Sequence, residues 1–140
     1  MKFLSIFFAT ISLAAAAGAG WRTTLVDYLS RPAVSGIAVG SPSLGSGKVK
    51  VKVTNDGNEV VKYSGYSSTL PQLFWEKKKE KEWVDDGWMW CGTGISEFQL
   101  KAGSSIEFEI DVQPGMRYFT FFDSLDGKRS SLVLLFQNEE

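Results

Sequence analysis

Two stretches of the chain alternate strictly between apolar and charged residues. Residues 48–53 read Lys-Val-Lys-Val-Lys-Val, and residues 106–112 read Ile-Glu-Phe-Glu-Ile-Asp-Val. Successive side chains of a β-strand point to opposite faces, so a period of two is typical of a strand with one buried face. Each stretch is therefore predicted to form a half-buried strand.

Other short apolar runs, separated by glycine, proline, asparagine and aspartate, predict further strands. These runs are residues 37–39, 59–63, 73–75, 83–84, 98–100, 116–122 and 132–136. The last two runs are apolar at both parities, which is typical of strands that are covered on both faces or central in their sheet. Helical spacing occurs in residues 24–29, ahead of Arg31 and Pro32, and predicts at most a two-turn helix, with an extended arm as the alternative.

This series of short strands without a long helical pattern favours an all-β fold. The expected architecture is an antiparallel two-sheet sandwich of the immunoglobulin-like kind with about 7–9 strands, and a small barrel is the alternative. We expect one sandwich domain over residues 35–140, preceded by an N-terminal arm or short helix over residues 20–34.

The first 19 residues have the composition of a secretory signal peptide. Lys2 is followed by an apolar run and then by the small residues Ala17, Gly18 and Ala19, which fit the cleavage rule. An uncleaved anchor is the alternative, but the run is shorter than the roughly 20 residues of a spanning helix. The sequence therefore predicts a secreted or periplasmic protein that starts at Gly20 and has no stable membrane insertion after cleavage.

The composition excludes several kinds of chemistry. The chain has no histidine, one cysteine and a formal net charge of −1. Without histidine, Ser-His and Cys-His nucleophiles and imidazole metal sites are not possible. The near-zero charge, with mixed signs, does not favour nucleic acid as a partner. We therefore expect no enzyme activity, no catalytic residues, no metal and no cofactor.

Two acidic motifs have structural interpretations. Asp85 and Asp86 precede Gly87, so they are predicted to lie in a turn and to point to solvent rather than to act as paired catalytic carboxylates. Residues 123–127 resemble part of a calcium loop but lack its third ligand position and terminal glutamate, which favours a hairpin turn.

The most site-like stretch is residues 88–94, which contains Trp88, Met89, Trp90, Cys91, Gly92, Thr93 and Gly94. Alternation sends the two indoles to one face and Met89 with Cys91 to the other. If the indoles face solvent, they form an aromatic platform for a sugar or a protein, with Trp75 or Trp83 as further members. If they face inward, they are core residues and Cys91 is an exposed thiol. The glycines indicate a tight turn rather than a phosphate loop.

Several of these features together resemble small secreted bacterial proteins with one immunoglobulin-like or fibronectin-III-like domain. They are the strand over residues 49–53, Asn55, the Trp-x-Cys-Gly-Thr-Gly turn, and Leu100 with Gly103 before an alternating strand. The resemblance spans residues 35–136 and lacks the paired cysteines of antibody domains. In such a fold an early and a middle strand are neighbours, so the lysine and acidic stripes of the two alternating strands should pair across the ladder.

These observations favour a secreted, non-catalytic module that acts by surface binding. A protein partner is the first expectation. A carbohydrate-binding module that uses Trp88 and Trp90 to bind a polysaccharide is one alternative, and a small secreted enzyme inhibitor is another.

Overall fold

The computed structural model of the protein describes residues 20–89 and 94–139. Two short helices, α2 (Trp21–Thr24) and α3 (Val26–Leu29), precede the strands. The strands are β1 (Ile37–Val39), β2 (Ser43–Gly45), β3 (Lys48–Asn55), β4 (Val61–Ser67), β5 (Leu70–Pro71), β6 (Phe74–Lys79), β7 (Glu82–Trp88), β8 (Ser96–Leu100), β9 (Ser105–Asp111), β10 (Met116–Ser124) and β11 (Ser130–Asn138).

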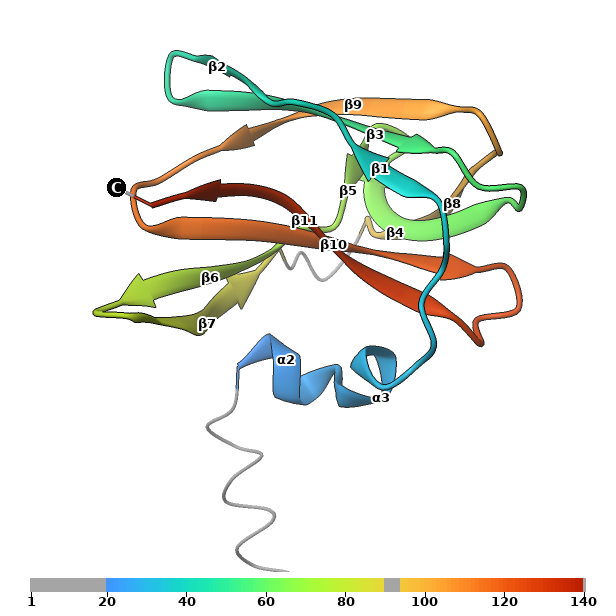
Figure 1. The fold of residues 1–140 in the computed structure, drawn as a ribbon, viewed down its shortest axis with the longest axis horizontal. Helices are drawn as coiled ribbons and strands as arrows, with labels where there is room; N and C mark the ends of the chain where they lie inside the picture. The colour runs from blue at the N-terminus through green and yellow to red at the C-terminus, as the bar shows by residue number, and fades with distance from the viewer. Residues whose placement is uncertain (1–19, 90–93, 140) are drawn as a thin grey trace, which may run out of the picture.

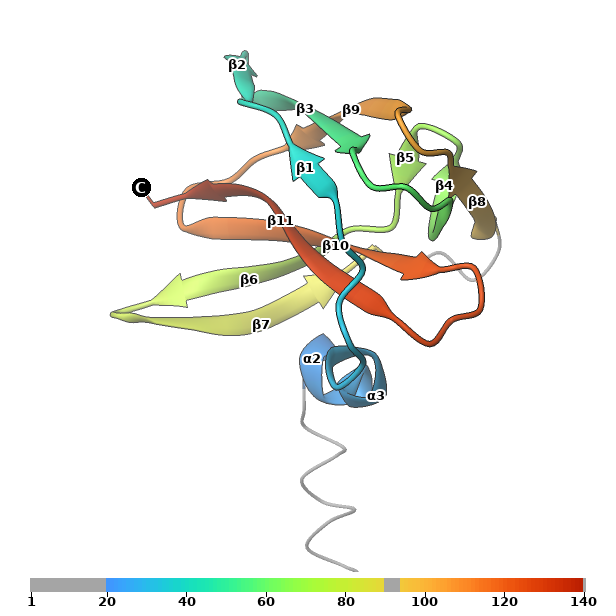
Figure 2. The same cartoon turned by 45° about the vertical axis from the view of Figure 1, so that its right-hand side comes forward.

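The strands form two antiparallel sheets that pack as a sandwich, which confirms the predicted fold class (Figures 1 and 2). One sheet has four strands, β1, β2, β3 and β9, and the other has seven, β4 to β8, β10 and β11. The described residues thus contain eleven strands rather than 7–9. The short strands β2 and β5 were not among the nine predicted runs, and they account for the difference from nine.

The predicted pairing of the charged stripes is confirmed. Lys48, Lys50 and Lys52 on β3 lie opposite Asp111, Glu109 and Glu107 on β9, respectively. The intervening valines on β3 are fully buried, and the apolar side chains of β9 are buried with at most 7% of their surface exposed. Because a shift of one residue would send every valine to solvent and every lysine into the core, the alternation fixes the register of this strand pair.

The seven-stranded sheet is covered on both faces, as the apolar residues at both parities of β10 predict. On its inner face Tyr118 and Phe122 belong to the main core between the sheets. On its outer face Phe119 and Phe121 pack in a second cluster with Trp21 of α2. The two helices lie across this outer face in both ribbon views (Figures 1 and 2).

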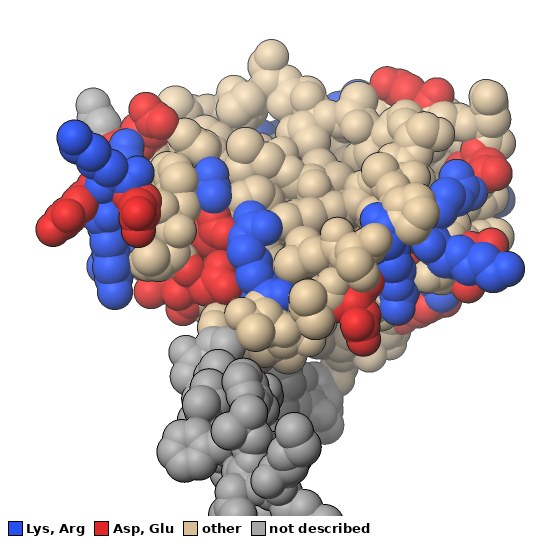
Figure 3. Space-filling view, turned by 60° about the horizontal axis from the view of Figure 1, so that its bottom comes forward, with Lys and Arg blue, Asp and Glu red and all other residues tan. Residues whose placement is uncertain are grey.

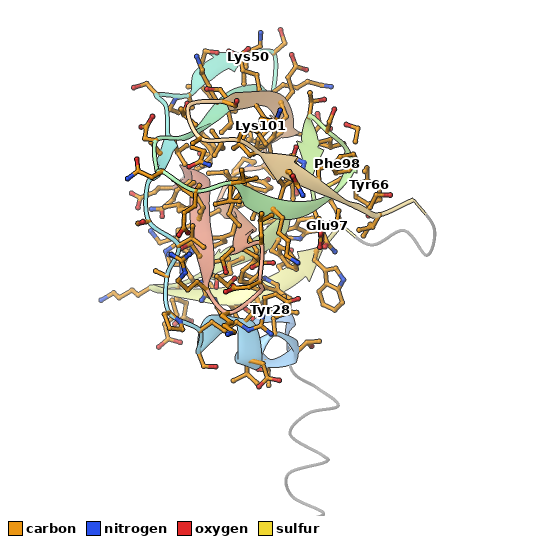
Figure 4. The ribbon with its side chains drawn as sticks, turned by 90° about the vertical axis from the view of Figure 1, so that its right-hand side faces the viewer. Tyr28, Lys50, Tyr66, Glu97, Phe98 and Lys101 are labelled. Atoms are coloured by element: carbon orange, nitrogen blue, oxygen red, sulfur yellow. The ribbon has the colours of Figure 1, made fainter. Side chains whose placement is uncertain are left out.

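The two outer faces of the molecule differ in character. Figure 4 shows Lys50 on the charged face of β3 at one end of the molecule and Tyr28 on α3 at the opposite end. The outer face of the four-stranded sheet carries the paired charges of β3 and β9, whereas the outer face of the seven-stranded sheet carries the helices.

The helix predicted over residues 24–29 is present in part of that range, since α3 covers Val26–Leu29 and ends shortly before Pro32.

Candidate binding groove between the sheets

A groove of about 460 Å³ lies along one side of the sandwich, where β9 of the four-stranded sheet faces β5 to β7 of the other. We call it the inter-sheet groove. Its apolar lining consists of Leu70, Leu73, Trp75, Met89, Ile110, Met116 and Tyr118, and its polar lining of Asp86, Glu109, Asp111 and Gln113. Its volume falls in the range of about 300–1,000 Å³ that is usual for ligand sites.

The position of the groove follows from how the sheets end. On the opposite side of the sandwich, β1 contacts β11, so the edges of the two sheets meet there. On the groove side, β9 pairs with β3 alone among the strands that the structure describes. Among the described strands, β9 is therefore the edge of its sheet on this side, and side chains of the main core line the groove beside it.

Side chains of the core make up the floor of the groove. Leu73, Ile110 and Met116 are buried, while Trp75 and Met89 are partly buried and pack against the same core. Methionine side chains are flexible and polarisable, and for this reason they adapt to apolar partners of different shape. The floor is therefore suited to an apolar side chain inserted from outside.

Carboxylates form much of the rim. Glu109 and Asp111 lie near the end of β9, where Lys48 approaches their carboxylate oxygens at 4.0 and 3.6 Å. Asp86 lies on the other side of the groove, on β7, where the ladder with β6 shifts by one residue. Ion pairs between such exposed groups contribute little to stability, so the rim acids remain open to a cationic partner.

Of the four tryptophans named as candidate site residues, the three that the structure describes do not lie on one surface. Trp75 lines the inter-sheet groove. Trp83 lies under the guanidinium group of Arg117, at 4.6 Å from the ring centroid. Trp88 is 37% exposed and lines a small pocket beside α2 with Trp21 and Phe74. An aromatic platform of Trp75, Trp83 and Trp88 is therefore not present.

The stretch from residue 88 to residue 94 is described only at its ends. Trp88 is partly exposed, whereas Met89 packs against the main core. For the two described residues of the alternating pattern, the indole therefore lies on the outer face and the methionine on the core face. Gly94 is exposed, has a φ of +107°, and has open space around it, as a turn glycine does. Trp90, Cys91, Gly92 and Thr93 lie outside the described residues, so the predictions for an indole pair and for the thiol stay predictions.

A cluster of charged side chains lies on the outer face of the seven-stranded sheet. Glu76 is buried, with 2% of its side chain exposed, and forms ion pairs with both Arg22 and Arg117. Asp85 accepts a hydrogen bond from the backbone N–H of Arg22 at 3.1 Å. Burial raises the pKa of Asp85, and the nearby charge of Glu76 adds to this effect, although the hydrogen bond from Arg22 opposes it.

The expectation that Asp85 and Asp86 lie in a turn is wrong, although Asp86 is exposed to solvent as predicted. Both residues lie within β7, and the side chain of Asp85 is only 17% exposed. The reason is the shift in the β6–β7 ladder, which pairs Trp75 with Gly87 and Glu76 with Asp85 and leaves Asp86 between them. A bulge of this kind can keep a strand going through residues that usually mark a turn.

A smaller pocket of about 120 Å³ lies on the same outer face, near Tyr28, Phe121 and Asp123. Burial raises the pKa of the Asp123 carboxyl, and this outweighs the opposing influence of Ser130, Arg31 and Lys62. The pocket is well below the usual size of a ligand site, so the inter-sheet groove is the better candidate.

Asp123→Asn should test the cost of this burial. A raised pKa means that the folded protein holds the proton more tightly than the unfolded chain, so the carboxyl destabilises the fold increasingly as the pH rises through its titration range. We expect the variant to melt at a higher temperature than wild type at neutral pH and to lose this advantage towards about pH 4. Thermal unfolding at both pH values measures the difference, and an advantage that grows on acidification would contradict the expectation.

The predicted hairpin turn joins β10 to β11, but it spans residues 125–129, since Asp123 and Ser124 belong to β10. Asp126 accepts hydrogen bonds from the Ser124 hydroxyl at 2.6 Å and from the Lys128 backbone N–H at 2.9 Å.

Within residues 20–89 and 94–139, no group of three or more acidic or cysteine side chains is arranged to hold a metal ion. No helix in these ranges has the length and apolar character needed to cross a membrane.

Comparisons with known proteins add no assignment. The chain matches no protein-family model, and no curated protein matches it. The resemblance to small secreted proteins with one immunoglobulin-like domain therefore stays a prediction.

The sequence did not predict the inter-sheet groove, because its lining residues come from five separate strands and their connecting loops, which only the fold brings together.

Proposed function

We propose that this protein is a secreted, non-catalytic binding module that holds an apolar segment of a protein partner in the inter-sheet groove. The observation that carries the proposal is the open apolar floor of the groove, with Trp75, Met89 and Met116, beneath a rim of carboxylates. Aromatic residues and methionine are enriched in protein interfaces, whereas sites for free sugars need exposed aromatic faces.

The mixed surface charges of the protein disfavour nonspecific electrostatic binding to a polyanion. On the face seen in Figure 3, acidic and basic side chains are interspersed, and neither sign covers a large area. A surface of this kind does not favour a polyanion such as nucleic acid. The acids at the rim of the groove instead favour basic residues that flank the apolar segment.

Filling the groove should abolish binding. Gln113 is exposed at the mouth of the groove, so Gln113→Trp is expected to block entry without disturbing the core. A matched control is Gln99→Trp, at an exposed position on β8 that does not line the groove. Peptides selected on the wild-type protein from a display library of random short peptides should bind the Gln113→Trp variant at least about tenfold more weakly, and the control unchanged.

The same selection separates the alternatives. Peptides that bind wild type and Gln113→Trp equally would overturn the proposal. So would a polysaccharide panel in which a sugar binds and Trp88→Ala abolishes its binding, since Trp88 lies on the outer face and does not line the groove.

A further inference from the structure

No strand within residues 20–89 and 94–139 pairs with the edge of β9 that faces away from β3, and this edge borders the inter-sheet groove. Hydrogen bonds from Val112 N–H to Gly47 C=O and from Asn55 N–H to Ser104 C=O show that even-numbered residues at both ends of β9 bond towards β3. In an antiparallel ladder, consecutive residues direct their backbone groups to opposite sides. The N–H and C=O groups of Glu107, Glu109 and Asp111 therefore point to the edge away from β3.

An additional strand at this edge would extend the four-stranded sheet over the groove. Residues beside Ile110 on the inner face would place their side chains among Trp75, Met89 and the other apolar residues of the groove floor. Residues beside Glu109 on the outer face would meet the acidic stripe, which lysines of β3 neutralise from one side only. The edge thus favours a strand that alternates apolar and basic residues.

The same charges disfavour a second copy of β9 as the occupant. Pairing β9 with its own copy would bring two acidic stripes together across a ladder, and like charges directly opposite each other are destabilising. The alternating basic and apolar pattern of β3 is complementary to the acidic stripe of β9, and β9 already pairs with β3 at its other edge.

From these observations we infer that β9 is a strand-addition site that pairs with an extended segment of a protein partner in which apolar residues alternate with lysine or arginine. The inference rests on the proposed function, because the apolar side chains of that segment would occupy the inter-sheet groove. The backbone supplies hydrogen bonds, the groove selects apolar side chains and the stripe selects basic ones.

A capped synthetic peptide with the sequence of residues 48–53 is the probe. We expect calorimetric titration to detect binding that weakens by at least about tenfold for the Gln113→Trp variant and for a control peptide with three lysines followed by three valines. In an antiparallel addition, the backbone N–H groups of the peptide's lysines would bond to Glu109 and its neighbours, whereas those of its valines would point away from β9. Methylating the backbone nitrogens of the lysines should therefore abolish binding, and methylating those of the valines should not.

Each outcome decides between the two proposals. Loss of binding by only one of the two methylated peptides supports strand addition. Loss by the peptide with methylated lysines indicates an antiparallel strand, and loss by the peptide with methylated valines indicates a parallel one. Equal binding of both methylated peptides, or of the alternating peptide and its block control, overturns strand addition but leaves the groove as a site if Gln113→Trp still weakens binding. If the probe does not bind while library peptides bind in the groove, the strand-addition inference fails alone. If Gln113→Trp weakens the binding of no peptide, both proposals fail.

Discussion

Replacing Trp21 with alanine is expected to lower the free energy of unfolding by about 4 kcal/mol, as for other fully buried tryptophans. No part of Trp21 is exposed, and its ring packs at 5.2 Å from Phe74 and 5.9 Å from Phe119, measured between ring centroids. Its indole N–H also donates a hydrogen bond to the carbonyl oxygen of Trp75 at 2.9 Å. Removal of the ring would leave a cavity between the helical segment and the seven-stranded sheet.

Urea unfolding of the protein beginning at Gly20 measures this effect. Val26→Ala is the matched control, since Val26 lies in the same helical segment but is 59% exposed, and it should change stability by less than about 1 kcal/mol. Equal losses for the two variants would show that the helical segment does not stabilise the sandwich through Trp21.

Replacing Glu76 with glutamine is expected to cost about 3 kcal/mol, at the lower end of the range for breaking a buried ion pair. The substitution keeps the shape of the side chain but leaves Arg22 and Arg117 without their shared carboxylate. The side chains of Arg22 and Arg117 are 35% and 24% exposed, so water compensates for part of the loss.

The control for Glu76→Gln is Glu97→Gln on β8. Glu97 pairs with Lys62 at 3.1 Å on the surface, with 59% of its side chain exposed, and a pair of this kind contributes at most about 1 kcal/mol. Chemical denaturation of both variants should therefore give a clearly larger loss for Glu76. If Glu76→Gln were as stable as Glu97→Gln, the cluster would not hold α2 against the sheet.

The strand pattern was predictable where burial is one-sided. Val49, Val51 and Val53 alternate with lysines, and this pattern predicted most of β3, while the expected fold added its pairing with the acidic stripe of β9. The same reasoning missed the bulge at Asp86, because a shift in a ladder depends on the partner strand and leaves no periodic signal.

The role of the N-terminal segment was less predictable. Apolar residues at both parities of β10 indicated that the outer face of its sheet is covered, but no local pattern identified Trp21 as part of the cover. A single buried tryptophan in a segment of two four-residue helices has no periodicity to detect. Long-range packing, rather than helix propensity, places these residues.

The candidate site was predicted in part. Trp75 was proposed as a binding residue and lies in the inter-sheet groove, but it was grouped with Trp83 and Trp88, which lie elsewhere. Ile110 and Met116 lie in strands predicted to have a buried face, and Leu70 lies outside the predicted strands. They line a groove only because the fold brings β5, β9 and β10 together along one side of the sandwich.

The central claim is that the inter-sheet groove binds a segment of a protein partner, and the methionines offer its most direct test. The chain has three methionines. Met1 lies in the predicted signal peptide, while Met89 and Met116 both line the groove. In protein that begins at Gly20 and carries ¹³C-labelled methionine methyl groups, we predict that both methyl signals shift progressively as the tightest peptide from the display library is added. Saturating binding of that peptide with both signals unchanged would contradict the account.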